Sequence, residues 1–195
     1  MKLVCMFVLI TLSGGLSAQV VFGNPMFRVL YYGYENTVDI GTNDGREFEL
    51  KSDNIRIKKS TNGYVFIPDS RENAQLYFID PNKGECFDTI QFEVRVLPAP
   101  DLYFGSAASG EKAKIFENVI YARYNESIPL IARFKVLDFS LAIGSGKVIT
   151  VSGNQLGDEL IQKLKSLEPD TLFTIVATVE GPDGLKRKIK GSWTR

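Results

Sequence analysis

The amino-acid sequence predicts an all-β protein with one short helix, arranged as two tandem β-sandwich domains behind an export signal. Three observations predict this. Apolar residues alternate with polar ones in long stretches, which is the pattern of strands with one buried face. Turn residues recur between short β-rich runs, as they do in sandwich folds. Two prolines, Pro98 and Pro100, interrupt the strands near the middle of the chain.

The first residues have the pattern of an export signal. Lys2 provides the positive start, Leu3–Leu12 is apolar, and small residues follow. We expect residues 1–18 to be a signal peptide that is cleaved between Ala18 and Gln19. The alternative is an uncleaved anchor, but an apolar run of about 10 residues is half of the ~20 that span a bilayer. We expect no integral membrane segment after cleavage.

The first β domain is expected to span residues 27–97, after a short N-terminal segment, residues 19–26. Its β-rich runs are separated by turn signals, for example Asn43–Gly45 and Asp80–Gly84. We expect strands at Phe27–Tyr32, Ile55–Lys59, Tyr64–Ile67, Gln75–Ile79 and Ile90–Val96.

The second β domain is expected to span residues 98–195, with Pro98 and Pro100 as the interdomain hinge. Proline has no backbone N–H and a fixed φ, so two prolines in three residues cannot lie inside a central sheet. We expect strands at Val119–Tyr124, Phe134–Ile143 and Phe173–Glu180.

The expected strand Phe134–Ile143 changes its alternation phase at Val136–Leu137. A one-residue slip turns every side chain to the opposite face, which predicts a β-bulge at this point. The alternative is a strand that is buried on both faces.

A helix is expected near residues 156–167. Leu156, Leu160, Ile161, Leu164 and Leu167 recur at steps of three and four, and charged residues lie between them. Such an apolar stripe predicts that the helix covers an edge or open end of the second domain. A partner-binding helix is the alternative.

The end of the chain is basic and carries Lys186, Lys188, Lys190 and Trp193. In a strand, the three lysines would share one face. They would then either guard an edge strand against aggregation or form a docking edge in which Trp193 is the aromatic anchor. We keep the four residues as interaction candidates.

Composition excludes several function classes. The formal net charge is zero, so we expect no nucleic-acid partner. The chain has no histidine, which removes Ser-His-Asp catalysis and histidine metal sites. We therefore expect no enzyme activity, no cofactor and no metal site. Cys5 lies in the expected signal, and Cys86 is expected to be a half-buried core residue without a disulfide partner.

Five segments carry a resemblance to a known family: Phe27–Asn36, Asn62–Tyr64, Asp101–Gly105, Val136–Phe139 and Gly181–Arg187. In this order and spacing, they resemble the C-terminal periplasmic part of the GldM/PorM gliding-motility and secretion family. The match covers nearly the whole mature chain. One departure is the single Gly105, where the family pattern has two glycines.

The resemblance implies two Ig-like β-sandwich domains. Members of that family form dimeric periplasmic shafts of the type IX secretion and gliding machinery. We therefore expect a short stand-alone exported protein of the periplasm or cell envelope, without a motor role, that acts as a structural or adaptor protein through protein–protein interaction. The expected partners are envelope proteins of the secretion and gliding machinery, together with a second copy in a homodimer.

The alternative function is an exported module that binds a glycan or a peptide. Sandwich folds host many functions, so the fold does not decide between the two. Exposed aromatic residues that line a groove would favour this alternative, and the candidates are Tyr31, Tyr32, Tyr34, Tyr103 and Trp193.

Overall fold

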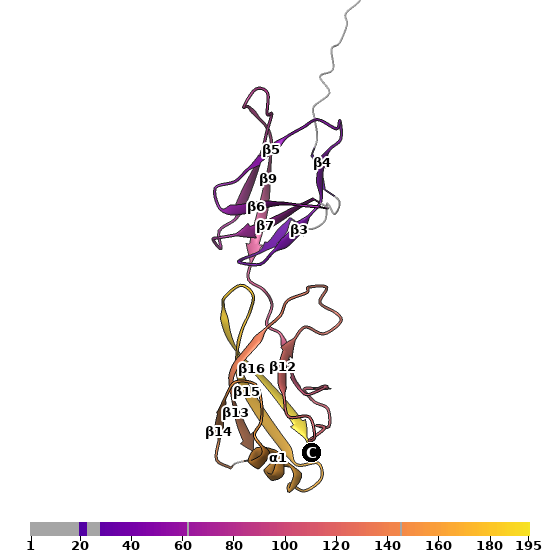
Figure 1. The fold of residues 1–195 in the computed structure, drawn as a ribbon, viewed down its shortest axis with the longest axis vertical. Helices are drawn as coiled ribbons and strands as arrows, with labels where there is room; N and C mark the ends of the chain where they lie inside the picture. Colours follow the sequence, from indigo (N-terminus) through magenta and orange to yellow (C-terminus); the bar gives the residue numbers. More distant parts are fainter. Residues whose placement is uncertain (1–19, 23–27, 62, 145) are drawn as a thin grey trace, which may run out of the picture.

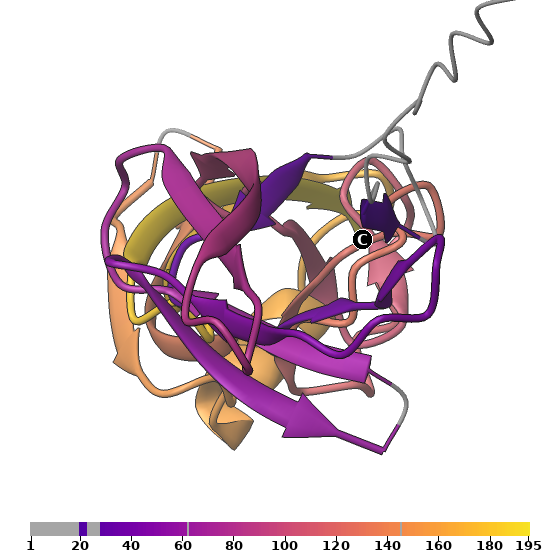
Figure 2. The same ribbon diagram turned by 90° about the horizontal axis from the view of Figure 1, so that it is seen from above.

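The structure is a computed structural model that describes residues 20–22, 28–61, 63–144 and 146–195. The expected signal peptide and its cleavage site between Ala18 and Gln19 lie outside the described residues. The strands form two groups, one beyond the other along the long axis, with residues 96–100 between them (Figure 1). Seen from above, the N-terminal strand group lies in front of the C-terminal one (Figure 2).

The N-terminal strand group, β1 to β9, contains three sheets among the described residues, with strand orders β2-β9-β8-β5, β3-β7-β6 and β1-β4. All strand pairs are antiparallel except β2 with β9, which is parallel. The strands are β1 Val20–Phe22, β2 Val29–Tyr31, β3 Asn36–Val38, β4 Ile40–Thr42, β5 Glu49–Lys51, β6 Ile55–Ser60, β7 Gly63–Pro68, β8 Ala74–Ile79 and β9 Cys86–Arg95.

The core of this group follows from the alternation in the sequence. Along β9, Ile90, Phe92 and Val94 are buried, and the residues between them are exposed. They pack with Phe66 of β7 and Leu76 of β8 in one hydrophobic cluster, so the cluster draws on both larger sheets. Burying each large apolar side chain contributes roughly 1.5–3 kcal/mol, which is why these two sheets stay together.

The C-terminal strand group, β10 to β16 with α1, contains two sheets among the described residues, with strand orders β11-β10-β12 and β14-β13-β15-β16. Its cluster of buried residues includes Phe104, Phe139, Phe173 and Trp193. The elements are β10 Asp101–Phe104, β11 Ala107–Ala108, β12 Ile120–Arg123, β13 Lys135–Ile143, β14 Ile149–Ser152, α1 Asp158–Lys165, β15 Leu172–Glu180 and β16 Lys186–Thr194.

The expected β-bulge is confirmed. The pairing of β13 with β15 shifts register between Val136 and Asp138, which leaves Leu137 as the extra residue. After the shift, Phe139 and Leu141 are buried on the core side. The change of phase in the sequence therefore keeps apolar side chains on the core face of a strand that bends.

The expected helix is confirmed as α1, and its apolar stripe faces the core. Ile161 and Leu164 are buried in the C-terminal cluster. Asp158 and Glu159 lie in the first turn and Lys163 in the last, an order of charges that complements the helix dipole. The helix therefore buries the stripe that the alternative interpretation assigned to a partner.

The described residues form a mostly β structure with one short helix and several sheets. Short strands of three residues, such as β3, β4 and β5, were not expected, because so few residues show no period.

The expectation for Cys86 was wrong. This thiol starts β9 but is exposed and donates to the Asp88 carbonyl oxygen at 3.2 Å, because β9 enters the core only at Ile90.

Candidate functional site: the proline linker and the terminal strand

The linker between the two strand groups is held by side chains of the C-terminal group. Pro98 and Pro100 lie in the irregular segment 96–100 between β9 and β10. The Leu97 side chain is buried, Pro98 is exposed, and Pro100 is buried again. The backbone carbonyls of Leu97 and Pro98 accept hydrogen bonds from Arg187 and Tyr124. The two expected hinge prolines therefore lie in a segment with defined attachment points.

Arg187 connects the linker to a buried carboxylate. Its Nη2 donates to the Leu97 carbonyl oxygen at 3.1 Å, and its Nη1 donates to Asp183 Oδ1 at 3.0 Å. The Arg187 side chain is 13% exposed and that of Asp183 is 0% exposed. A planar guanidinium presents several donors in fixed directions, so it can hold the carboxylate and the linker carbonyl together.

Asp183 is positioned by the turn before β16. Residues 181–184 close the β15–β16 hairpin, and the Gly181 N–H donates to the Leu185 carbonyl oxygen at 3.1 Å. Burial alone would raise the pKa of Asp183. Hydrogen bonds from Arg187 and from the Leu185 amide, together with the Arg187 charge, outweigh burial and hold this pKa below its ordinary value. The carboxylate therefore stays ionised beside the guanidinium.

Tyr124 makes the second attachment. Its hydroxyl donates to the Pro98 carbonyl oxygen at 2.8 Å. The ring meets Phe134 edge to face, with 5.2 Å between ring centroids, and the Arg187 guanidinium lies 5.9 Å from the Phe134 centroid. Burial raises the pKa of Tyr124 from 10.0 to about 12, so the phenol keeps its proton and its donor role well into the alkaline range.

The β2–β3 turn of the N-terminal strand group lies close to Asp183. Gly33 has φ +62°, and a Cβ at this position would lie 3.1 Å from the Asp183 Cα. Nearby, the Tyr34 hydroxyl donates to the Ile131 carbonyl oxygen at 3.1 Å. A glycine at residue 33 therefore lets the backbones of the two groups approach each other closely.

The expected aromatic groove residues are only partly brought together. Tyr31 and Tyr34 line a groove of about 600 Å³ together with Leu130 and Ile131. Tyr103 lies elsewhere, with the Arg123 guanidinium 4.2 Å from its ring centroid. Tyr32 faces Arg71 in a similar cation–π contact at 5.4 Å, a pairing that the sequence does not predict.

The terminal strand separates the four interaction candidates into two sets. Lys186, Lys188 and Lys190 alternate along β16 and are exposed on one face, as expected. Trp193 is fully buried, so its assignment as an exposed anchor was wrong. It has the opposite parity on β16, where its ring packs on Phe173 and its Nε1 donates to the Ala107 carbonyl oxygen at 3.2 Å.

The sequence does not single out Arg187 as a linker-binding residue, because it lies among the terminal lysines. Its parity along β16 is the opposite of theirs, which places it with the buried residues. The signal for this role was therefore available: a cation at a core-facing position needs a buried partner, and an Asp four residues earlier in a Gly-rich turn is one.

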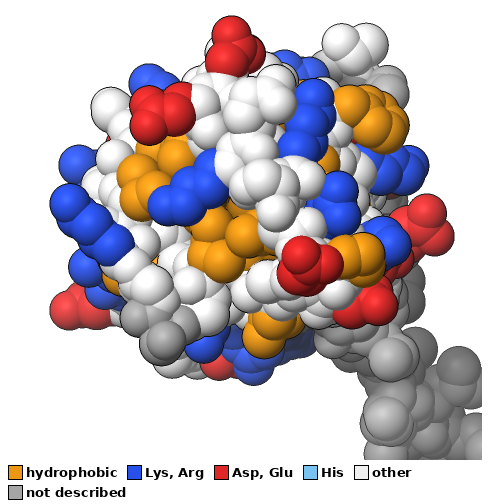
Figure 3. All heavy atoms as spheres, turned by 90° about the horizontal axis from the view of Figure 1, so that it is seen from below, with side chains coloured by type: hydrophobic (Ala, Val, Ile, Leu, Met, Phe, Trp, Pro, Cys, Tyr) orange, Lys and Arg blue, Asp and Glu red, His pale blue; other side chains and the backbone are white. Residues whose placement is uncertain are grey.

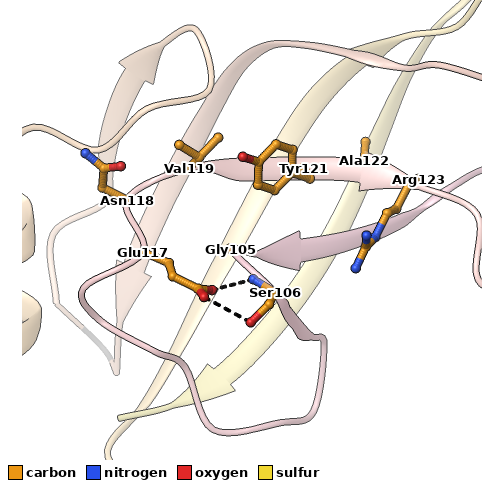
Figure 4. Close-up of a pocket in the computed structure, with 8 residues that line it drawn as sticks. All are labelled: Gly105, Ser106, Glu117, Asn118, Val119, Tyr121, Ala122 and Arg123. Atoms are coloured by element: carbon orange, nitrogen blue, oxygen red, sulfur yellow. Dashed lines mark hydrogen bonds between the residues drawn. The ribbon is translucent and has the colours of Figure 1, made fainter.

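A second groove, with a volume of about 510 Å³, lies between the turn that follows β10 and the segment that leads into β12. Figure 4 shows the Glu117 carboxylate pointing at Ser106. It accepts hydrogen bonds from the Ser106 N–H and from the Ser106 hydroxyl. The hydrogen bond from the Ser106 amide lowers the pKa of Glu117 below its ordinary value. The same turn needs Gly105, which has φ +56°, because a Cβ there would overlap Glu117. This carboxylate closes a loop.

Within the described residues, no group of three or more Asp, Glu or Cys side chains is placed to hold a metal ion. In the same part of the chain, no helix has the length and apolar character needed to cross a membrane. The far end of the C-terminal group shows basic, acidic and hydrophobic side chains interspersed (Figure 3). That end therefore presents no field of a single charge sign.

No protein-family model matches this chain, and no curated protein matches it either.

Proposed function

We propose that this protein is a non-enzymatic structural or adaptor protein of the cell envelope that acts by protein–protein interaction. Its two strand groups would then be tandem Ig-like β-sandwich domains, residues 27–97 and 98–195, exported to the periplasm or cell envelope by residues 1–18. The resemblance of its motifs to GldM/PorM supports this proposal.

The observation that carries the proposal is the attachment of the linker. Arg187 and Tyr124 hold two successive linker carbonyls, and the guanidinium is itself fixed by a carboxylate with no exposed surface. Burying an ion pair costs desolvation energy and is weak support for stability alone. It does fix one geometry, which suits a protein that must hold two binding modules at a constant separation.

The partners in this proposal are envelope proteins of the secretion and gliding machinery, with a homodimer as one assembly. The test is cross-linking in the native bacterium, followed by affinity purification and identification of the recovered proteins. An unrelated exported protein with the same tag provides the control. Specific recovery of secretion or gliding components supports the proposal, and their absence from the cross-linked material contradicts it.

A second candidate function is supported by the groove at Tyr31 and Tyr34. Two tyrosines beside Leu130 and Ile131 offer aromatic and aliphatic surface in one concave site, as glycan- and peptide-binding modules do. The test is a glycan array together with a peptide library, probed with the wild-type protein and with a Tyr31→Ala/Tyr34→Ala variant. A ligand that binds only the wild type favours this function, and the absence of any ligand removes it.

A further inference from the structure

The N-terminal half of β16 is an open sheet edge. This strand is the last in the order β14-β13-β15-β16, so only β15 pairs with it in the sheet. The C-terminal half of β16 is bonded to the segment that follows β11. The Ser192 N–H donates to Ser109 Oγ at 3.0 Å, and the Ser192 carbonyl oxygen accepts from the Gly110 N–H at 2.7 Å. Among the described residues, no hydrogen bond from outside β15 reaches the backbone of Lys186, Lys188 or Lys190.

The direction of the backbone groups follows from Ser192. In an antiparallel strand, residues alternate between pointing their N–H and C=O at the partner strand and away from it. Ser192 points its groups outward, toward Ser109 and Gly110, so the residues of the same parity also point theirs outward. These residues are Lys186, Lys188 and Lys190. The open edge therefore offers three N–H donors and three carbonyl acceptors.

The same three residues present a column of positive charge. Their side chains are exposed, and none of them is in an ion pair within the described part of the chain. Their neighbours on β15 are Glu180, Thr178 and Val176, of which only Glu180 is charged. Asp138 lies one strand further, opposite Thr178. Backbone groups and unpaired charges therefore coincide along one edge.

We propose that the Lys186–Lys190 edge binds an extended acidic segment of a partner protein by strand addition. This inference rests on the proposed protein–protein function and names the chemistry of the partner. A strand added here pairs its backbone with the outward groups of the three lysines, while its alternate side chains fall on the lysine face. Carboxylates at every second residue of that strand match the lysine spacing, because both strands repeat every two residues.

Charge decides against a second copy of this chain at the same edge. Two copies joined edge to edge would bring two lysine columns together, and like charges directly opposite each other in a sheet are destabilising. Lysines on an edge strand also discourage pairing with neutral strands. The same side chains that block general aggregation therefore select an acidic strand.

The experiment uses the mature chain and a labelled peptide in which glutamate alternates with threonine, measured by fluorescence anisotropy at low salt. The Lys186→Gln/Lys188→Gln/Lys190→Gln variant is expected to bind on the order of tenfold more weakly, since each exposed pair contributes a few-fold. The matched control replaces three exposed lysines elsewhere, Lys51, Lys163 and Lys165, with glutamine, and is expected to bind as the wild type does. Equal losses in both variants would overturn the proposal.

Two N-methylated peptides separate strand addition from simple charge attraction. One carries the methyl groups on its glutamate amides and the other on its threonine amides, with the same charge. Strand addition predicts that only one of them loses binding: the glutamate form in antiparallel pairing and the threonine form in parallel pairing. Unchanged binding of both, or equal loss in both, would overturn the proposal.

Three other results also bear on the edge. Self-association that the triple lysine variant abolishes would assign the edge to a second copy and overturn an acidic partner. Binding to anionic lipid vesicles without binding to the peptide would overturn it as well. If cross-linking still recovers envelope partners with the triple variant, the edge assignment fails and the proposed function stands.

Discussion

Replacing Arg187 with methionine would leave the Asp183 carboxylate buried without its counter-charge. Breaking a buried ion pair from one side costs about 3–5 kcal/mol. The Arg187 side chain is 13% exposed, and its loss also removes the donor to the Leu97 carbonyl. We therefore expect Arg187→Met to lower the free energy of unfolding by about 3 kcal/mol, at the lower end of that range.

Urea denaturation followed by tryptophan fluorescence measures this loss directly. Trp193 is the single tryptophan of the chain and is fully buried in the cluster of the C-terminal strand group, so its emission reports on that cluster. With an m-value of about 1 kcal/mol per M, the midpoint should fall by about 3 M. Arg187→Lys should give an intermediate loss, because it keeps the charge and loses the planar fork.

The double variant Asp183→Asn/Arg187→Met tests the reason for the effect. It removes both charges, so no uncompensated carboxylate remains, and it should be more stable than Arg187→Met alone. A loss below about 0.5 kcal/mol for Arg187→Met, typical of an exposed pair, would refute the reasoning. A double variant less stable than the single one would refute it as well.

Three further predictions concern the surroundings of the linker and the C-terminal core. Tyr124→Phe should lower the free energy of unfolding by about 1 kcal/mol, because the hydroxyl donor is lost. The folded pKa of Tyr124 is raised from 10.0 to about 12, so the stability of the wild type should fall as pH rises from 10.0 toward that value. The variant should lack this fall in a pH series of urea melts. Gly105→Ala should cost about 2 kcal/mol through its positive φ and its overlap with Glu117, and thermal melts should show little recovery when Glu117→Ala is added, because the Cβ at residue 117 would still overlap the new Cβ. Leu164→Ala, at a residue with no exposed surface, should cost about 3 kcal/mol in the same melts, whereas alanine at exposed Gln162 should cost almost nothing.

The long elements could be predicted from the sequence because their hydrophobic period repeats over many residues. The alternation of β9 and β15, the helix α1 and the β-bulge at Val136 all depend on runs long enough to show a phase. The three-residue strands escaped prediction. Their place is fixed by contacts such as those of the buried Asn36, whose side chain bonds both backbone groups of Tyr31.

The candidate site was predicted less completely. The linker prolines and the lysine column were identified from the sequence, and the lysines share an exposed face as the strand period requires. Trp193 has the opposite parity to the lysines along β16, and this is why it is buried and not exposed beside them. Tyr124 and Arg187 are 26 and 90 residues from the carbonyls that they hold, so no local pattern connects them.

By itself, the sequence determined where the longer strands and the helix form, because the period of apolar side chains decides which face can be buried. It also determined that two prolines break the chain between β9 and β10. The tertiary structure alone decided how that break is held. Arg187 comes from β16 and Tyr124 follows β12, and these strands lie in different sheets, so only the packing of the two sheets brings both side chains to the linker. Asp183, in the turn before β16, then holds the Arg187 guanidinium.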